Sequence, residues 1–221
     1  MGKAVTTILR GAAPLLLLLL AVVASPSTVR GHQLDEYLQA TLVAIEPGDV
    51  RLLINLTPGT EVAAQVLAQI DRDADGVISS AEAAAYADAL NQDLVVRLDD
   101  HPCELSLTAS NFPLPEDLRT GWGIIQLEYR VACGAFAGGP HRLTVQNRHQ
   151  HNVSAYLLNA AQPKSPALQI TAQKRNYNQS TGEIEFTVQA PPKAAPAAAI
   201  IGSLAALLIG GVAWLLKFGW Q

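Results

Sequence analysis

The acidic run from Asp71 to Glu82, DRDADGVISSAE, has the residue types and the spacing of a calcium-binding loop. It matches the EF-hand pattern D-x-[DN]-x-[DN]-G-x5-E at every specified position. Calcium takes about six to eight oxygen ligands, and carboxylates at alternate positions of a tight loop converge on one point. The predicted ligands are the carboxylates of Asp71, Asp73, Asp75 and Glu82, the main-chain carbonyl of Val77, and Ser79 through a bridging water.

The same run predicts how the loop is shaped and what the ion does. Gly76 permits a sharp turn, and Ser79 with Glu82 forms a capping box that starts a helix at the last ligand. Without an ion the four carboxylates repel one another, with only Arg72 nearby. The alternative is a solvated acidic turn between two helices. Because the sequence holds no second loop to pair with this one, we expect calcium to be mainly structural.

The two cysteines, Cys103 and Cys133, are predicted to form a disulfide. Cys103 has the parity of Leu105 in one strand pattern, and Cys133 has the parity of Val131 in another, so both thiols point toward the core. An oxidising compartment then favours the bridge, which contributes about 3 to 4 kcal/mol on a chain-entropy argument. The alternatives are two unpaired buried thiols, or a zinc site that lacks two further ligands.

Histidines offer a second, transition-metal hypothesis. We expect His149 and His151 to lie on the same face of a strand, where they can share an ion with a third ligand. If processing occurs before His32, the new amino terminus and the imidazole can chelate copper or nickel. The alternative for the pair is a solvated strand face.

Alternation of apolar and polar residues predicts a mainly β protein, which we interpret as an antiparallel β-sandwich. Val50 to Leu56, Ile125 to Val131 and Ile184 to Val188 alternate most clearly. Weaker runs bring the expected number of strands to about nine; they are Tyr37–Ile45, Leu94–Leu98, Glu104–Leu107, Leu143–Gln146, Val153–Leu158 and Leu168–Ala172.

One segment, residues 60–91, predicts a helix pair inserted between strands, with the acidic run as its connection. Its residues favour helices. The apolar positions repeat at helical spacing on each half. They are Val62, Val66, Leu67 and Ile70 in the first half, and Ala83, Tyr86, Ala87 and Leu90 in the second.

The two ends of the chain predict export and a single membrane anchor. Residues 1–31 have the order of a secretory signal, charged and then apolar, with cleavage expected after Ala24 or Gly31. Residues 32–190 form the exported domain, and residues 191–196 a proline-rich linker. Residues 197–216 carry no charge and are long enough for one transmembrane helix, which a tail of residues 217–221 follows.

Charge excludes one class of partner. All 19 acidic residues lie between Asp35 and Glu185, where only ten Lys or Arg occur, so this segment has a formal charge of 10 − 19 = −9. Such a surface repels a polyanion, and we therefore expect no binding of nucleic acid. With a single span, the chain is also not a multi-span transporter.

Several motifs occur in a recognisable order over residues 32–160. The acidic run is followed by RLDDHPCEL at 97–105, IxLxYxVxC at 125–133 and LxVxNRH at 143–149. This order resembles the extracytoplasmic domain of the HupE/UreJ family of hydrogenase- and urease-accessory membrane proteins. In that family the domain precedes a polytopic portion linked to nickel or cobalt uptake, which this chain lacks. The resemblance implies a bacterial envelope setting and supports the disulfide and the inserted loop.

We therefore expect a periplasmic calcium-binding protein with a single pass in the inner membrane. It would serve as a binding or accessory module for another envelope protein. The alternative is an accessory subunit that handles nickel, cobalt or copper beside a separate permease, using His32, His149 or His151. Spacing sets out no activated nucleophile and no paired acid and base, so we do not expect an enzyme.

Overall fold

The computed structural model describes residues 34–189 with the exception of residue 135. The predicted signal peptide, the proline-rich linker, the predicted transmembrane helix, the tail and His32 lie outside these residues. Among the helices that are described, none has the length and the apolar character needed to cross a membrane.

The described part of the protein is mainly β and contains two five-stranded sheets. The strand order is β5-β6-β2-β1-β8 in the first sheet and β4-β3-β7-β10-β9 in the second. The first sheet contains β1 (Tyr37–Glu46), β2 (Asp49–Pro58), β5 (Glu104–Asn111), β6 (Ile125–Ala132) and β8 (Ser154–Ala160). The second contains β3 (Leu94–Leu98), β4 (His101–Pro102), β7 (Gly139–Asn147), β9 (Leu168–Arg175) and β10 (Thr181–Val188).

Both sheets contribute their inward side chains to one hydrophobic core. In β2 the burial pattern alternates along the strand, because successive side chains point to opposite faces. Leu52 and Ile54 of the first sheet and Leu143 and Ile184 of the second are completely buried in this core. The alternating windows of the sequence therefore correspond to strands with one face in the core, and the prediction of a mainly β protein is confirmed.

The prediction of a wholly antiparallel arrangement is wrong at one pair of strands. β1 pairs with β8 in parallel, with Tyr37 opposite Ser154 and Val43 opposite Ala160. The reason is the path of the chain: β7 belongs to the second sheet, and the connection that follows it carries the chain into the first sheet. β8 then runs beside β1 in the same direction. Alternation of apolar and polar residues indicates which face of a strand is buried. It does not indicate whether the neighbouring strand is parallel or antiparallel.

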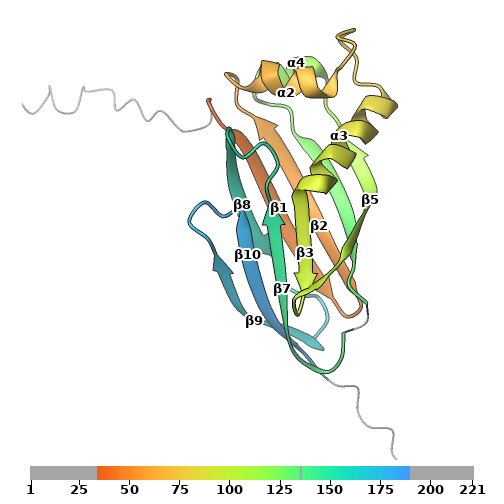
Figure 1. Cartoon of the computed structure of the whole chain (residues 1–221), viewed down its shortest axis with the longest axis vertical. Helices are drawn as coiled ribbons and strands as arrows, with labels where there is room; N and C mark the ends of the chain where they lie inside the picture. Colours follow the sequence, from red (N-terminus) through yellow and green to blue (C-terminus); the bar gives the residue numbers. More distant parts are fainter. Residues whose placement is uncertain (1–33, 135, 190–221) are drawn as a thin grey trace, which may run out of the picture.

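Three helices gather at one end of the two sheets (Figure 1). α2 (Ala63–Ile70) and α3 (Ser80–Asp93) stand between β2 and β3 in the chain, and both bury apolar side chains in the core. Val66 and Ile70 of α2 and Leu90 of α3 are completely buried. The third helix, α4 (Pro115–Arg119), begins with proline, which suits the first helical position.

The predicted disulfide between Cys103 and Cys133 is present and is confirmed. The Cα atoms of the two residues are 4.6 Å apart, and 30 positions separate them in the chain. Both side chains are partly buried against the hydrophobic core. Cys103 directly precedes β5 and Cys133 directly follows β6, so the bridge fastens the adjoining ends of two paired strands.

Candidate metal centre

The acidic loop, residues 71–82, begins where α2 ends and reaches into the first turn of α3. Asp71 caps the C-terminus of α2, and its N–H donates to the carbonyl of Leu67 at 2.8 Å. Ser79 caps the N-terminus of α3, and with Glu82 it forms the capping box that the sequence predicts. Because the buried faces of α2 and α3 hold both helices against the core, the two ends of the loop have fixed positions.

Backbone N–H groups of the loop orient its three aspartates. Oδ2 of Asp71 accepts from the N–H of Gly76 at 3.1 Å, and Oδ1 of Asp73 accepts from the N–H of Asp75 at 3.2 Å. Oδ1 of Asp75 accepts from the N–H of Val77 at 2.8 Å. Each aspartate thus uses one carboxylate oxygen to shape the loop, which leaves the other oxygen for a further partner.

Glu82 is held by bonds from both sides of the loop. Its Oε2 accepts from the N–H of Ser79 at 2.9 Å and from the hydroxyl of Ser79 at 2.7 Å. Its Oε1 accepts from the N–H of Arg72 at 2.7 Å. These hydrogen bonds, led by those from Ser79, lower the pKa of Glu82 to about 2. Glu82 is therefore a carboxylate throughout the physiological range, which is the form that binds a cation.

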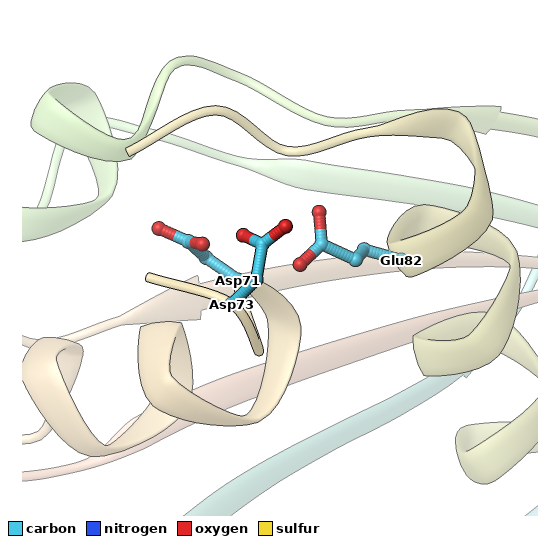
Figure 2. Close-up of side chains that lie close together, drawn as sticks. All are labelled: Asp71, Asp73 and Glu82. Atoms are coloured by element: carbon cyan, nitrogen blue, oxygen red, sulfur yellow. The ribbon is translucent and has the colours of Figure 1, made fainter. Parts of the chain in front are cut away.

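Three carboxylates of the loop face one another (Figure 2). One oxygen from each of Asp71, Asp73 and Glu82 lies within 4.8 Å of the others. Asp71 and Asp73 come from the start of the loop, and Glu82 comes from the first turn of α3. Asp75 is not in this group of three. The ligand roles of the Val77 carbonyl and, through a water, of Ser79 stay predictions; the hydroxyl of Ser79 also donates to Glu82.

The carboxylate of Asp71 has an oxygen that no group in the described part of the chain satisfies. Asp71 is only 8% exposed, and its Oδ1 is buried with no hydrogen-bond partner. A buried charged oxygen without a partner is costly, so such an atom points to a missing ligand. The ion pairs among residues 34–189 do not include any carboxylate of the acidic loop.

The donor set fits a hard cation. The three gathered ligand atoms are carboxylate oxygens, and the loop contains neither histidine nor cysteine. Oxygen donors suit calcium, magnesium or manganese, whereas imidazole and thiolate suit the softer transition metals. A divalent cation at this place would neutralise the mutual repulsion of the carboxylates and give Oδ1 of Asp71 the partner that it lacks.

The prediction that His149 and His151 share a strand face is wrong. Both residues lie in the turn between β7 and β8, where His149 is buried and His151 is exposed. Nδ1 of His149 is 2.8 Å from Oδ2 of Asp93, and its Nε2 is 3.2 Å from the hydroxyl of Tyr86. Burial, which outweighs the contact with Asp93, lowers the pKa of His149. Its ring nitrogens are therefore occupied by the protein itself.

His149 belongs to a buried polar network that the sequence analysis does not predict. The hydroxyls of Tyr37 and Tyr86 are 2.7 Å apart, and the amide of Gln39 donates to the carbonyl of His149 at 2.9 Å. Asn147 donates to Oε1 of Gln39 at 2.8 Å. A signal exists in the sequence, because Gln39 and Asn147 occupy inward positions of strands whose other inward residues are mostly apolar. This network joins α3 to both sheets.

Comparison with known proteins adds no relative: no protein-family model, no curated protein and no solved structure matches the chain.

Proposed function

We propose that this chain is a calcium-binding protein of the bacterial envelope, in which the ion occupies the acidic loop as in an EF-hand. The observation that carries the proposal is the buried, unpartnered Oδ1 of Asp71, which belongs to a group of three facing carboxylates. Hydrogen bonds from the loop backbone orient these carboxylates before any ion binds. Pre-orientation of this kind supports a site rather than a solvated acidic turn.

Calcium has a mainly structural role in this proposal. Asp71 ends α2 and Glu82 lies in the first turn of α3, so an ion held by both residues ties the two helices together. The same helices bury Ile70 and Leu90 in the core that both sheets share. Calcium therefore stabilises the helical end of the domain, which we assign to a β-sandwich with an inserted helix-loop-helix.

The setting follows from the ends of the chain and from the family resemblance. Export by residues 1–31 and anchoring by residues 197–216 would place the domain in the periplasm, on a single span of the inner membrane. External calcium is abundant enough to keep a site filled even when its dissociation constant is about 10⁻⁴ to 10⁻³ M. The domain then acts as a binding or accessory module for another envelope protein.

Isothermal titration calorimetry of the full chain with calcium, magnesium and nickel tests this function. We expect saturable calcium binding that Glu82→Gln abolishes, because the substitution removes one ligand oxygen. The matched control is Glu104→Gln, which changes an exposed glutamate outside the acidic loop and leaves binding unchanged. Binding of nickel without binding of calcium would refute the proposal and favour the transition-metal accessory role instead.

A further inference from the structure

Large apolar side chains are exposed at the helical end of the molecule. We call this end the tip and define it as residues 34–36, 59–82 and 112–124. Trp122 is 85% exposed and Leu114 is 71% exposed. Of the nine large hydrophobic residues that are exposed in the described part of the chain, five belong to the tip; they are Leu34, Val77, Leu114, Trp122 and Ile124. Such a concentration is typical of a surface that binds another molecule.

The segment that carries Leu114 and Trp122 is firmly held. The carbonyl of Asp117 accepts from the N–H of Trp122 at 3.1 Å and from the N–H of Gly123 at 2.8 Å. Gly123 packs so closely that a Cβ atom there would lie 2.7 Å from the backbone nitrogen of Leu118. The backbone that carries the exposed Trp122 is therefore already ordered. Less conformational entropy is then lost when a partner binds.

Other parts of the tip lie beside this segment. A Cβ atom at Gly121 would contact the methyl group of Thr60 at 3.4 Å. The next residue in the chain, Glu61, donates its N–H to the carbonyl of Leu34 at 2.8 Å. Leu34 and Gly121, the residue before Trp122, therefore both lie beside the stretch formed by Thr60 and Glu61.

The tip is strongly acidic around these apolar residues. It contains only two basic residues, Arg72 and Arg119. Besides the four carboxylates of the acidic loop, its acidic residues are Asp35, Glu36, Glu61, Glu116 and Asp117. A bound calcium ion offsets two of these charges and leaves the tip negative.

We propose that the tip is a docking surface for a basic polypeptide segment that carries an apolar anchor. The inference deepens the proposed binding role and rests on it. Trp122 and Leu114 offer apolar area to the anchor, and the face of Trp122 also attracts a lysine or arginine. The surrounding carboxylates attract basic residues and repel anionic lipids and nucleic acid.

The described part of the chain ends away from the tip. β10 is the last described strand, and its end at Val188 pairs with Gly139 at the end of the sheets away from the helices (Figure 1).

Three synthetic 18-residue peptides that lack tryptophan test the inference on the full chain. One contains leucine and lysine at amphipathic helical spacing, the second replaces leucine with serine, and the third replaces lysine with glutamate. Trp214→Phe and Trp220→Phe leave Trp122 as the single tryptophan of the chain. We expect the leucine–lysine peptide to bind and to shift the Trp122 emission to shorter wavelength, because docking removes the indole from water. The other two peptides should leave the emission unchanged.

Variants then locate the site by calorimetry with the leucine–lysine peptide. Trp122→Ala should weaken binding at least about tenfold, as expected for a central aromatic contact. Tyr177→Ala removes an even more exposed aromatic residue from the turn between β9 and β10 and should change binding less than twofold. Circular dichroism confirms that each variant retains the fold.

Any of five results would overturn the inference. They are binding of no peptide, equal binding of all three peptides, unchanged binding to Trp122→Ala, an emission shift caused by anionic phosphatidylglycerol vesicles without peptide, and self-association of the chain through Trp122. Calcium binding is measured on the same samples. If calcium binds and no peptide does, the docking surface is refuted and the proposed function stands. If calcium does not bind, the proposed function is refuted whatever the peptides do.

Discussion

Two acidic segments of this protein differ in the partners of their carboxylates. Asp99 and Asp100 form the turn between β3 and β4, and both have basic partners within the chain. Oδ2 of Asp99 is 2.7 Å from Nδ1 of His141, and Oδ2 of Asp100 is 2.8 Å from Nη2 of Arg142. In the acidic loop, the carboxylates of Asp71 and Glu82 accept only neutral N–H and O–H groups and face one another instead.

Under the proposed function, the contrast indicates which end of the molecule gains stability from a ligand. The Asp99–Asp100 turn has His141 and Arg142 as partners, and the disulfide of Cys103 fixes the chain a few residues later. The acidic loop gathers three carboxylates, and none of them has an ion-pair partner among the described residues. We therefore expect the turn to be stable by itself and the loop to gain its stability from calcium.

Removal of the disulfide should have the largest effect. The variant Cys103→Ala/Cys133→Ala should lose about 3 to 4 kcal/mol of the free energy of unfolding. Without the bridge, the unfolded chain has more conformational entropy. Urea denaturation measures this loss.

The loss should be the same with calcium and with chelator, since the bridge and the acidic loop lie in different parts of the fold. A loss that depended on calcium would contradict the separation of the two ends.

The same substitution in both acidic segments should have opposite consequences. Asp99→Asn weakens the pair with His141, so we expect a loss of about 1 kcal/mol both with and without calcium. Asp71→Asn keeps an acceptor for the N–H of Gly76 and replaces the unpartnered oxygen with a donor close to Asp73 and Glu82. In chelator this variant should be at least as stable as wild type, and calcium should no longer stabilise it.

Thermal melting with calcium and with chelator compares these variants. The account of the acidic loop would fail if Asp71→Asn lowered the melting temperature in chelator, because that result would show a carboxylate already satisfied by the protein. It would also fail if calcium raised the melting temperature of the variant as much as that of wild type.

Two histidines, His141 beside Asp99 and His149 beside Asp93 of α3, should produce a smaller effect with opposite dependence on pH. The hydrogen bond with Asp99 raises the pKa of His141, so its stabilisation is complete below the ordinary value of 6.5 and is lost as pH rises through the folded pKa. Burial lowers the pKa of His149, so its contribution is present above 6.5 and is lost as pH falls through the folded pKa.

Proton NMR titration of the imidazole signals measures both values, with His141→Gln and His149→Gln as the variants that assign them. We expect His141 to titrate above 6.5 and His149 below it. A value for His149 above that of His141 would contradict the buried, neutral imidazole described for the polar network.

Features that depend on local pattern were predictable, and features that depend on neighbours were not. Alternation identified β2, and the residue types of the acidic run identified the loop and the cap at Ser79, because each is decided by a few adjacent residues. The parallel pairing of β1 with β8 depends on where the chain crosses between sheets. α4 has five residues, too few for helical periodicity to be visible.

The candidate site follows the same division. The residue types and spacing of Asp71, Asp73 and Glu82 predicted a metal site, and the structure gathers these three carboxylates. The burial of His149 against Tyr86 depends on α3 meeting the turn after β7, two segments far apart in the chain. The spacing of His149 and His151 therefore predicted a strand where the structure has a turn.

The most direct test of the central claim is the melting temperature of the full chain, measured in chelator and then in calcium at about 100 times the dissociation constant. Binding to the folded state alone should stabilise it by about 2.7 kcal/mol, which corresponds to a rise of about 5 to 10 °C for a domain of this size. Glu82→Gln should show no such rise. An equal melting temperature in chelator and in calcium for wild type would contradict the claim that the acidic loop is a structural calcium site.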